Sequence, residues 1–309
     1  MALKVIITAP VHPFLIETLK EKGYELLYEP AISYSDLAAI ISDCHGLVVT
    51  TRLKVDHTII EKATSLKWIA RLGSGMELID TTFAATKGII CVSSPEGNRT
   101  TVGEHTLGLL LSLMNRIHSA YDEIKLGKWI RDANRADELS GKVVGIIGLG
   151  NTGTAFAKVL QGFDVKIIAH DTNEGVFKGN TIQSVTLQSL QEQSDIISVH
   201  LPLTPLTFQY VNDDFFKACL KKPYFISTCR GQVTDTAAVL KALQNQSVRG
   251  VGLDVLENEQ LSTYAPDEKA ILDNLIQYPN FIVTPHIAGY SHEAFYKMAK
   301  VVLEKLAII

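Results

Sequence analysis

The chain has 309 residues, a length that predicts two domains. Hydrophobic residues make up 46% and charged residues 20%, the balance of a soluble globular protein; a net charge of −4 without a basic tract argues against nucleic-acid or membrane partners. The four dispersed cysteines have no C-x-x-C or Cys/His spacing, so we expect reduced thiols in a cytoplasmic protein and no metal site.

The N-terminal third alternates apolar runs with helix-like stretches. The first run, residues 4–9, ends at Pro10, too early for a signal-peptide core, and no apolar stretch approaches membrane-spanning length. Further apolar runs cover residues 46–49, 68–72 and 88–92, and helical stretches cover 13–22, 57–63 and 80–86. Such alternation predicts βαβ units on a parallel sheet.

A helix is predicted over residues 100–118, where apolar residues recur at helical spacing. It is either a bridge between domains or an ordinary core helix. A second series of apolar runs follows, at 143–147, 165–170, 196–201, 224–228, 248–255 and 281–286, and a final helix covers 291–307. The predicted fold is therefore α/β, with two doubly wound parallel-sheet domains.

The segment 141–171 carries a dinucleotide fingerprint. The apolar run 143–147 leads into Gly148-Leu-Gly150-Asn-Thr-Gly153, a helix-like stretch and a second apolar run follow, and Asp171 ends the unit. Gly148 permits a tight turn, Gly150 lets the backbone approach a pyrophosphate, and Gly153 lets helix and strand pack closely. The helix N-terminus, with Asn151 and Thr152, offers N–H groups to phosphate oxygens.

Asp171 bears on the choice of cofactor. A carboxylate accepts hydrogen bonds from the ribose hydroxyls and repels a 2′-phosphate, and no Arg follows it in Thr172-Asn173-Glu174. The sequence predicts NAD rather than NADP, although His170 leaves the second open.

Reactive residue types collect after several predicted strands, where ligands bind in open α/β sheets. Hydride transfer to or from a 2-hydroxy acid needs a general acid/base, a carboxylate beside it and a cation, and His286, Glu259 and Arg230 supply these. Taken singly, each has an ordinary explanation, as a core histidine, a solvated loop acid and a helix-capping arginine.

Together, ordered motifs along the chain resemble the D-isomer-specific 2-hydroxyacid dehydrogenases. They are segments 71–75 (RLGSG), 98–104 (NRTTVGE), 145–153 (GIIGLGNTG), 200–207 (HLPLTPLT), 228–231 (TCRG), 252–255 (GLDV) and 284–289 (TPHIAG). The resemblance implies a flavodoxin-like substrate-binding domain of residues 1–98 and 288–309, a Rossmann NAD-binding domain of residues 99–287, and a homodimer.

The resemblance also assigns roles to residues. Arg230 binds the substrate carboxylate and carbonyl, Glu259 pairs with His286, and His286 is the acid/base. A carboxylate beside imidazole favours its charged form and orients the ring. The implied cofactor residues, beyond those of the fingerprint, are His200, Pro202, Thr207, Thr228, Cys229, Asp254 and Gly289, and the implied substrate residues are Arg52, Ser74, Gly75 and Arg230.

Some positions depart from the family pattern. Gln260 replaces the usual Pro after the catalytic Glu, Cys229 replaces the usual Ala before the Arg, and Glu77-Leu78 replaces Asp-Asn after the glycine loop. We expect these to affect substrate details, not the reaction class. We also expect no regulatory domain after Ile309.

Arg52 suggests the substrate, because phosphoglycerate dehydrogenases of the family carry a phosphate-binding Arg at the corresponding place. The alternative is a solvated charge beside Lys54. The leading hypothesis is NAD-dependent oxidation of D-3-phosphoglycerate, as in serine biosynthesis. The alternatives are a glyoxylate/hydroxypyruvate or broad 2-ketoacid reductase and a non-catalytic NAD-sensing corepressor.

Overall fold

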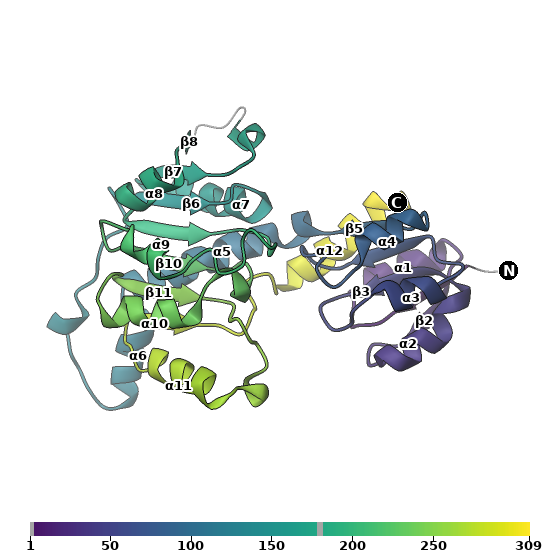
Figure 1. Cartoon of the computed structure of the whole chain (residues 1–309), viewed down its shortest axis with the longest axis horizontal. Coiled ribbons are helices and arrows are strands. Elements are labelled where there is room, and N and C mark those ends of the chain that lie inside the picture. The colour runs from purple at the N-terminus through teal and green to yellow at the C-terminus, as the bar shows by residue number, and fades with distance from the viewer. Residues whose placement is uncertain (1–2, 178–181) are drawn as a thin grey trace. The chain divides into compact units, whose positions relative to one another are not determined.

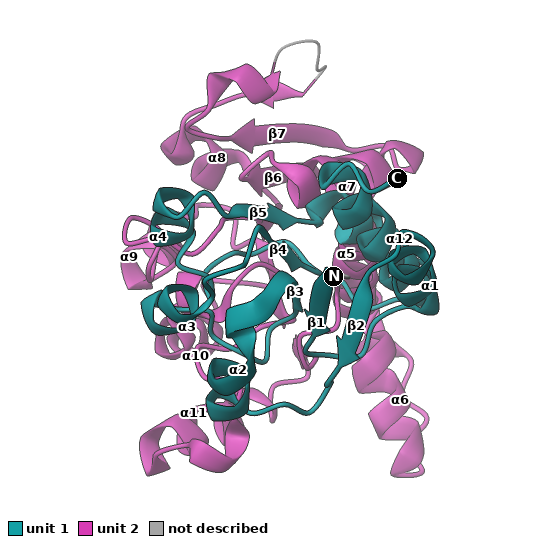
Figure 2. Ribbon diagram, turned by 90° about the vertical axis from the view of Figure 1, so that its right-hand side faces the viewer, with its two compact units in different colours: residues 1–100, 289–309 teal, residues 101–288 magenta. Residues whose placement is uncertain are grey.

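The computed structural model describes residues 3–177 and 182–309. Within them the chain forms two compact units (Figure 2), one reaching to Thr100 and including Gly289–Ile309, the other spanning Thr101–Ala288. The domain boundary expected after residue 98 lies two residues before the observed one, and the boundary expected after residue 287 lies one residue before it. The first boundary falls inside one helix, α5 (Pro95–Met114). No helix in the described part of the chain is both long and apolar enough to cross a membrane.

The first unit is built on a five-stranded parallel sheet in the order β2-β1-β3-β4-β5, the flavodoxin order. Its strands are β1 (Lys4–Ile7), β2 (Glu25–Tyr28), β3 (Cys44–Val49), β4 (Trp68–Arg71) and β5 (Ile90–Ser93) (Figure 1). Its helices are α1 (Pro13–Glu21), α2 (Tyr34–Ile40), α3 (His57–Lys62), α4 (Thr81–Thr86), the start of α5, and α12 (His292–Lys305).

The central strands of this sheet, β1, β3 and β4, are buried on both faces, which explains their continuous hydrophobic runs. Along β1, Val5 and Ile7 pack into a cluster with α1 and α12, while Ile6 packs into the cluster on the other face with α2 and α3. The helices begin where short polar side chains cap them: Asp56 starts α3 and Ser291 starts α12.

The second unit is built on a seven-stranded parallel sheet in the order β12-β11-β10-β9-β6-β7-β8, a Rossmann order with one added strand. Its strands are β6 (Val143–Ile147), β7 (Lys166–His170), β8 (Gln183–Ser184), β9 (Ile196–Val199), β10 (Tyr224–Ser227), β11 (Gly250–Leu253) and β12 (Phe281–Val283). Its helices are the remainder of α5, α6 (Ile117–Lys125), α7 (Asn151–Val159), α8 (Leu187–Gln193), α9 (Asp213–Lys217), α10 (Thr236–Gln244) and α11 (Pro266–Leu275).

The predicted fold class, two doubly wound parallel α/β domains, is confirmed, with corrections in detail. Strands β2 and β8 were not predicted, because β2 has no long apolar run and β8 is only two residues long. The helix predicted over 100–118 begins earlier, at Pro95, and ends at Met114, because Arg116 has a left-handed backbone (φ +54°) that separates α5 from α6.

Candidate active site

The turn after β6 needs its glycines. Gly148 has φ +87°, and a Cβ there would lie 2.5 Å from the carbonyl oxygen of His200. A Cβ at Gly153 would overlap the carbonyl oxygen of Gly148. A side chain at either position would therefore push the turn, the start of α7 and the end of β9 apart.

Gly150 is different, because a Cβ there would meet no atom within 4 Å. It caps α7 without a side-chain hydrogen bond, so the backbone at the helix start is open to approach. Asn151 and Thr152 form the first turn, where the helix dipole favours an anion. The turn also lies at the point where the strand order reverses between β6 and β9, where such sheets bind ligands.

Asp171 follows β7, the neighbour of β6. One carboxylate oxygen accepts a hydrogen bond from the Leu149 N–H (2.7 Å) and the other from the Asn173 N–H (2.8 Å). A carboxylate has about four acceptor positions, so it can still accept from ribose hydroxyls. The open glycine turn and this acid fit a dinucleotide, with pyrophosphate at the start of α7 and adenosine ribose at Asp171.

His200 lies directly after β9 and is buried, with 7% of its surface exposed. Burial lowers its pKa to about 3, so the ring is neutral at physiological pH. Its Nε2 lies 2.9 Å from the Ser198 hydroxyl, and its Nδ1 has no hydrogen-bond partner among the described residues. Beyond it, Thr207 closes its loop by donating to the carbonyl oxygen of Pro202 (2.6 Å).

Arg230 follows β10 and is half-buried. Its guanidinium donates to the carbonyl oxygen of Cys229 at 2.7 Å. The next residue must be small, because a Cβ at Gly231 would overlap the carbonyl oxygen of Leu256 in the segment after β11. Thr228 is buried, with its hydroxyl 3.2 Å from that of Thr106.

His286 and Glu259 are in direct contact. The imidazole Nδ1 lies 2.9 Å from the Glu259 carboxylate, and the two side chains are 37% and 45% exposed. His286 follows β12 and Glu259 follows β11, its neighbour in the sheet. The chain fold thus brings together two residues that are 27 positions apart.

Asp254 is fully buried, and its carboxylate is surrounded by donors from the segment after β12. It accepts hydrogen bonds from the Thr284 hydroxyl (2.6 Å), the Ile287 N–H (2.9 Å) and the Ala288 N–H (2.7 Å). These bonds hold the segment that carries His286. For Asp254 the sequence predicted a cofactor role, and this structural role was not predicted.

The remaining predicted residues lie in the first unit. The Ser74 hydroxyl donates to Asn98 at 3.0 Å, next to the half-buried Gly75. A Cβ at Gly289 would lie 2.6 Å from the Asn98 amide nitrogen, so Gly289 is fixed by close packing. Their predicted ligand roles remain predictions.

Arg52 is bound to the backbone of its own unit. Its two terminal nitrogens donate to the carbonyl oxygens of Ile32 (2.7 Å) and Thr8 (2.8 Å). Thr8 directly follows β1 and Arg52 lies just after β3, the strand beside it. These contacts use two of the five N–H donors of the guanidinium, so phosphate binding would compete with or share this arrangement.

One residue near the site was not predicted from the sequence, although its partner Thr284 belongs to the predicted motif 284–289. His105 on α5 has its Nε2 3.0 Å from the hydroxyl of Thr284. The two lie 179 positions apart, and no spacing pattern in a single sequence links residues so distant.

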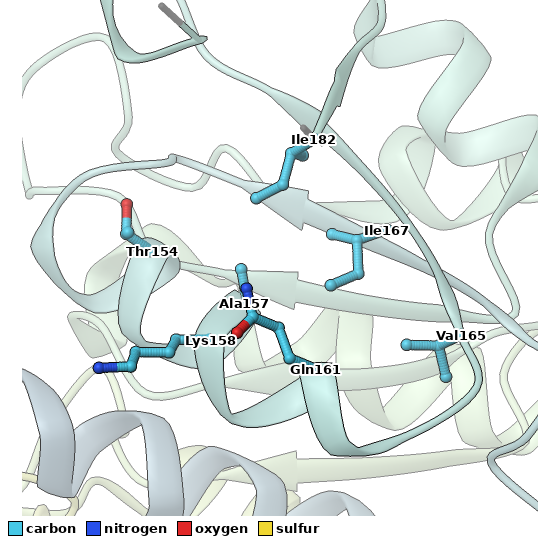
Figure 3. Close-up of a pocket in the computed structure, with 7 residues that line it drawn as sticks. All are labelled: Thr154, Ala157, Lys158, Gln161, Val165, Ile167 and Ile182. Atoms are coloured by element: carbon cyan, nitrogen blue, oxygen red, sulfur yellow. The ribbon is translucent and has the colours of Figure 1, made fainter. Parts of the chain in front are cut away.

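A pocket of about 420 Å³ lies between α7 and β7 (Figure 3). Its lining includes Ala157, Lys158, Gln161 and Ile167 and none of the predicted site residues.

Residues 107–288 match the family model of the D-isomer specific 2-hydroxyacid dehydrogenases, in its NAD-binding domain. The chain belongs to this family. The matched range coincides closely with the second unit, which holds the glycine turn, Asp171, Arg230 and the His286–Glu259 pair. NAD is therefore the cofactor of this domain.

The relatives that match this chain are named for different activities, as D-3-phosphoglycerate dehydrogenases and as a glyoxylate reductase. The chain is 33% identical to D-3-phosphoglycerate dehydrogenase of Sus scrofa, over 94% of this chain and 53% of that protein. It is 34% identical to glyoxylate reductase of Thermofilum pendens, over 90% of this chain and 81% of that protein. The chain thus spans about half the length of the phosphoglycerate dehydrogenases it matches. The structure of D-lactate dehydrogenase of Aquifex aeolicus, complexed with NAD and lactic acid, superimposes with a TM-score of 0.83 at 26% identity, covering 98% of this chain and 94% of that one.

Proposed function

We propose that the protein is an NAD-dependent D-2-hydroxyacid dehydrogenase that interconverts a 2-hydroxy acid and its 2-keto acid. The observation that carries the proposal is the 2.9 Å contact between His286 Nδ1 and the Glu259 carboxylate, within an NAD-binding domain of this family. The bound cofactor supplies the hydride acceptor or donor. The residues of the chain supply the proton and bind the oxygens.

The contact supports an assignment of roles to the two imidazole nitrogens. A carboxylate only accepts hydrogen bonds, so His286 Nδ1 must carry a proton, and Nε2 is the nitrogen that exchanges a proton with the substrate oxygen. In the imidazolium form Nε2–H donates to the carbonyl during reduction, and in the neutral form Nε2 accepts the hydroxyl proton during oxidation. Arg230 binds the carboxylate and stabilises charge that develops on the carbonyl oxygen.

A turnover assay with NADH and 2-keto acids tests the proposal. We expect turnover of at least one among glyoxylate, hydroxypyruvate, pyruvate and 3-phosphohydroxypyruvate. His286→Asn should lower it by roughly 10²- to 10⁴-fold, the usual effect of losing a general acid/base. Tight NADH binding without turnover of any of them would instead support an NAD-sensing protein.

Asp171 supports NAD over NADP, because its carboxylate would face the 2′-phosphate. Its two hydrogen bonds to the chain make Asp171→Ala a poor test, since that change also frees the Leu149 N–H. Asp171→Asn removes the charge and keeps an acceptor for one of the two N–H groups, so it disturbs the turn less than Asp171→Ala. It should narrow the preference for NADH over NADPH in a fluorescence titration, and equal binding of both by the wild type would contradict this role.

For the substrate, we propose D-3-phosphoglycerate first. Its support is the position of Arg52 after β3, at the point where the strand order of the first sheet reverses, together with relatives of that name. A glyoxylate reductase is the second candidate, because the Arg52 guanidinium already binds two backbone carbonyls and because the relative in Thermofilum pendens is matched over most of its length.

The pair 3-phosphohydroxypyruvate and hydroxypyruvate separates the two, since they differ only in the phosphate. If Arg52 binds the phosphate, Arg52→Lys should lower kcat/KM for the phosphorylated acid by about 10-fold or more, the effect of losing a charge-assisted hydrogen bond, and leave hydroxypyruvate nearly unchanged. Lys54→Ala, which removes an exposed cation two residues away, is the control. Equal losses for both acids would favour the reductase.

A further inference from the structure

A chain of hydrogen bonds links helix α5 to the segment that carries His286. The Nε2 of His105 on α5 lies 3.0 Å from the Thr284 hydroxyl, and that hydroxyl lies 2.6 Å from Oδ1 of Asp254. His105 Nε2 is also 3.6 Å from Oδ1 of Asp254, so the three side chains meet at one point. All three belong to the second unit, on α5, after β12 and after β11.

The direction of each bond follows from the number of protons. The buried carboxylate of Asp254 accepts, so Thr284 must give it the single hydroxyl proton. The oxygen of Thr284 can then only accept from His105, which therefore carries a proton on Nε2. His105 is thus the first donor in the chain, and Asp254 is its end.

The backbone around His286 has an unusual conformation. His286 has φ +54°, in the left-handed region that residues with a Cβ rarely adopt. Its N–H donates to the carbonyl oxygen of Asp254 (2.8 Å), and the N–H groups of Ile287 and Ala288 donate to the Asp254 carboxylate. Such a turn persists when surrounding contacts determine it.

We propose that His105 and Thr284 are positioning residues for His286: by fixing Asp254, they hold the left-handed turn that presents the imidazole to Glu259. The hydrogen bonds of their side chains go to each other and to Asp254, so we expect each residue to act through the backbone around His286. The expected loss of turnover rests on the proposed function, because it takes His286 as the acid/base. The expected change in the position of the His286 ring does not depend on the proposed function.

Thr284→Val tests the proposal, because it keeps the shape of the side chain and removes the hydroxyl. Thr234→Val is the matched control, since Thr234 is also a threonine of the second unit, is buried and has no hydrogen-bond partner for its hydroxyl among the described residues. The first readout is the NMR signal of His286 in protein labelled with carbon-13 at histidine Cε1. The chain has nine histidines, and His286→Asn identifies the signal.

We expect Thr284→Val to move or broaden the His286 signal and to lower kcat by about 10- to 100-fold, with NADH binding retained, because a misplaced acid/base costs rate more than binding. Thr284→Ser, which restores the hydroxyl, and Thr234→Val should stay near wild type. A His286 signal that stays in place in Thr284→Val, or that moves equally in Thr234→Val, overturns the proposal.

His105 is tested in the same way. His105→Gln can place an amide N–H near the position of Nε2 and should stay close to wild type, while His105→Leu should behave like Thr284→Val. Wild-type behaviour of His105→Leu would remove His105 from the network. If the wild-type protein turns over no 2-keto acid, the proposed function fails, and the His286 signal alone then decides the positioning proposal.

Discussion

At the scale of single residues, the contact between His286 and Glu259 matters for orientation more than for stability. Both side chains are more than a third exposed, and ion pairs in such settings contribute little to the free energy of unfolding. The carboxylate instead accepts from Nδ1 and fixes the orientation of the ring.

We therefore predict that Glu259→Gln lowers turnover by about 10- to 100-fold while the melting temperature changes little. The variant removes the carboxylate that accepts from Nδ1 and orients the ring. Initial rates with NADH and a 2-keto acid, together with thermal melting, measure the two effects. Ordinary turnover in Glu259→Gln would exclude Glu259 from the pair.

His200 has the opposite character, because it is buried and neutral. Its pKa falls from an ordinary 6.5 to about 3 through burial, so the unfolded chain binds a proton more readily than the folded one. Stability linked to this group is present above pH 6.5 and is lost as the pH falls toward 3. Between pH 7 and pH 5 the expected loss is about 2 kcal/mol.

Urea unfolding at pH 7 and pH 5 measures this loss. His200→Gln cannot gain the proton, so its stability should depend less steeply on pH than that of the wild type, by up to this amount. His292→Gln, at an exposed histidine, serves as the control. Parallel pH dependence in wild type and His200→Gln would show that His200 is not held neutral by burial.

At the scale of elements, the turn from β6 into α7 separates two uses of glycine. Gly148 and Gly153 are required by the folded chain itself, because a Cβ at either would press on a carbonyl oxygen. Gly150 faces open space, so only a bound molecule would be obstructed there.

We predict that Gly153→Ala lowers the free energy of unfolding by about 1–3 kcal/mol, the usual effect of overpacking. Gly150→Ala should cost at most about 1 kcal/mol, because Ala caps helices poorly, yet should weaken NADH binding by about 10-fold or more. Gly162→Ala, where a Cβ also meets no atom within 4 Å, is the control for stability and binding. Unaltered NADH affinity in Gly150→Ala would place the pyrophosphate elsewhere.

At the scale of the whole molecule, the expected homodimer remains a prediction. Its support in the structure is an apolar surface on α6 and the segment after it. Ile117, Tyr121 and Ile124 recur at helical spacing and are exposed, and Trp129 is 82% exposed. Helix α6 is drawn in Figure 1 at the edge of its unit. Exposed apolar surfaces of this kind commonly mark protein interfaces.

If a second copy covers this surface, sedimentation velocity should give a dimer for the wild type. The double variant Tyr121→Ser and Trp129→Ser should then sediment as a monomer. Leu220→Ser, which removes another exposed apolar side chain, should stay dimeric. A wild-type monomer, or a double variant that remains a dimer, would contradict this interface.

The sequence by itself determined the fold class and the cofactor, because both rest on local patterns. Strands buried on both faces must be continuous apolar runs, and Ile6 and Ile7 of one run indeed pack into different clusters. Glycine is needed wherever backbone approaches backbone, so the fingerprint from Gly148 to Gly153 was recognisable without coordinates.

Only the tertiary structure decided what distant residues do to one another. In the folded chain Thr284 lies between His105 and Asp254, and the Arg52 guanidinium donates to two backbone carbonyl oxygens. Helix α5 ends at Met114, before the left-handed Arg116. Hydrogen bonds between residues far apart in the chain leave no periodic trace in one sequence. They depend on which strand ends become neighbours, and that is fixed only when the sheet is assembled.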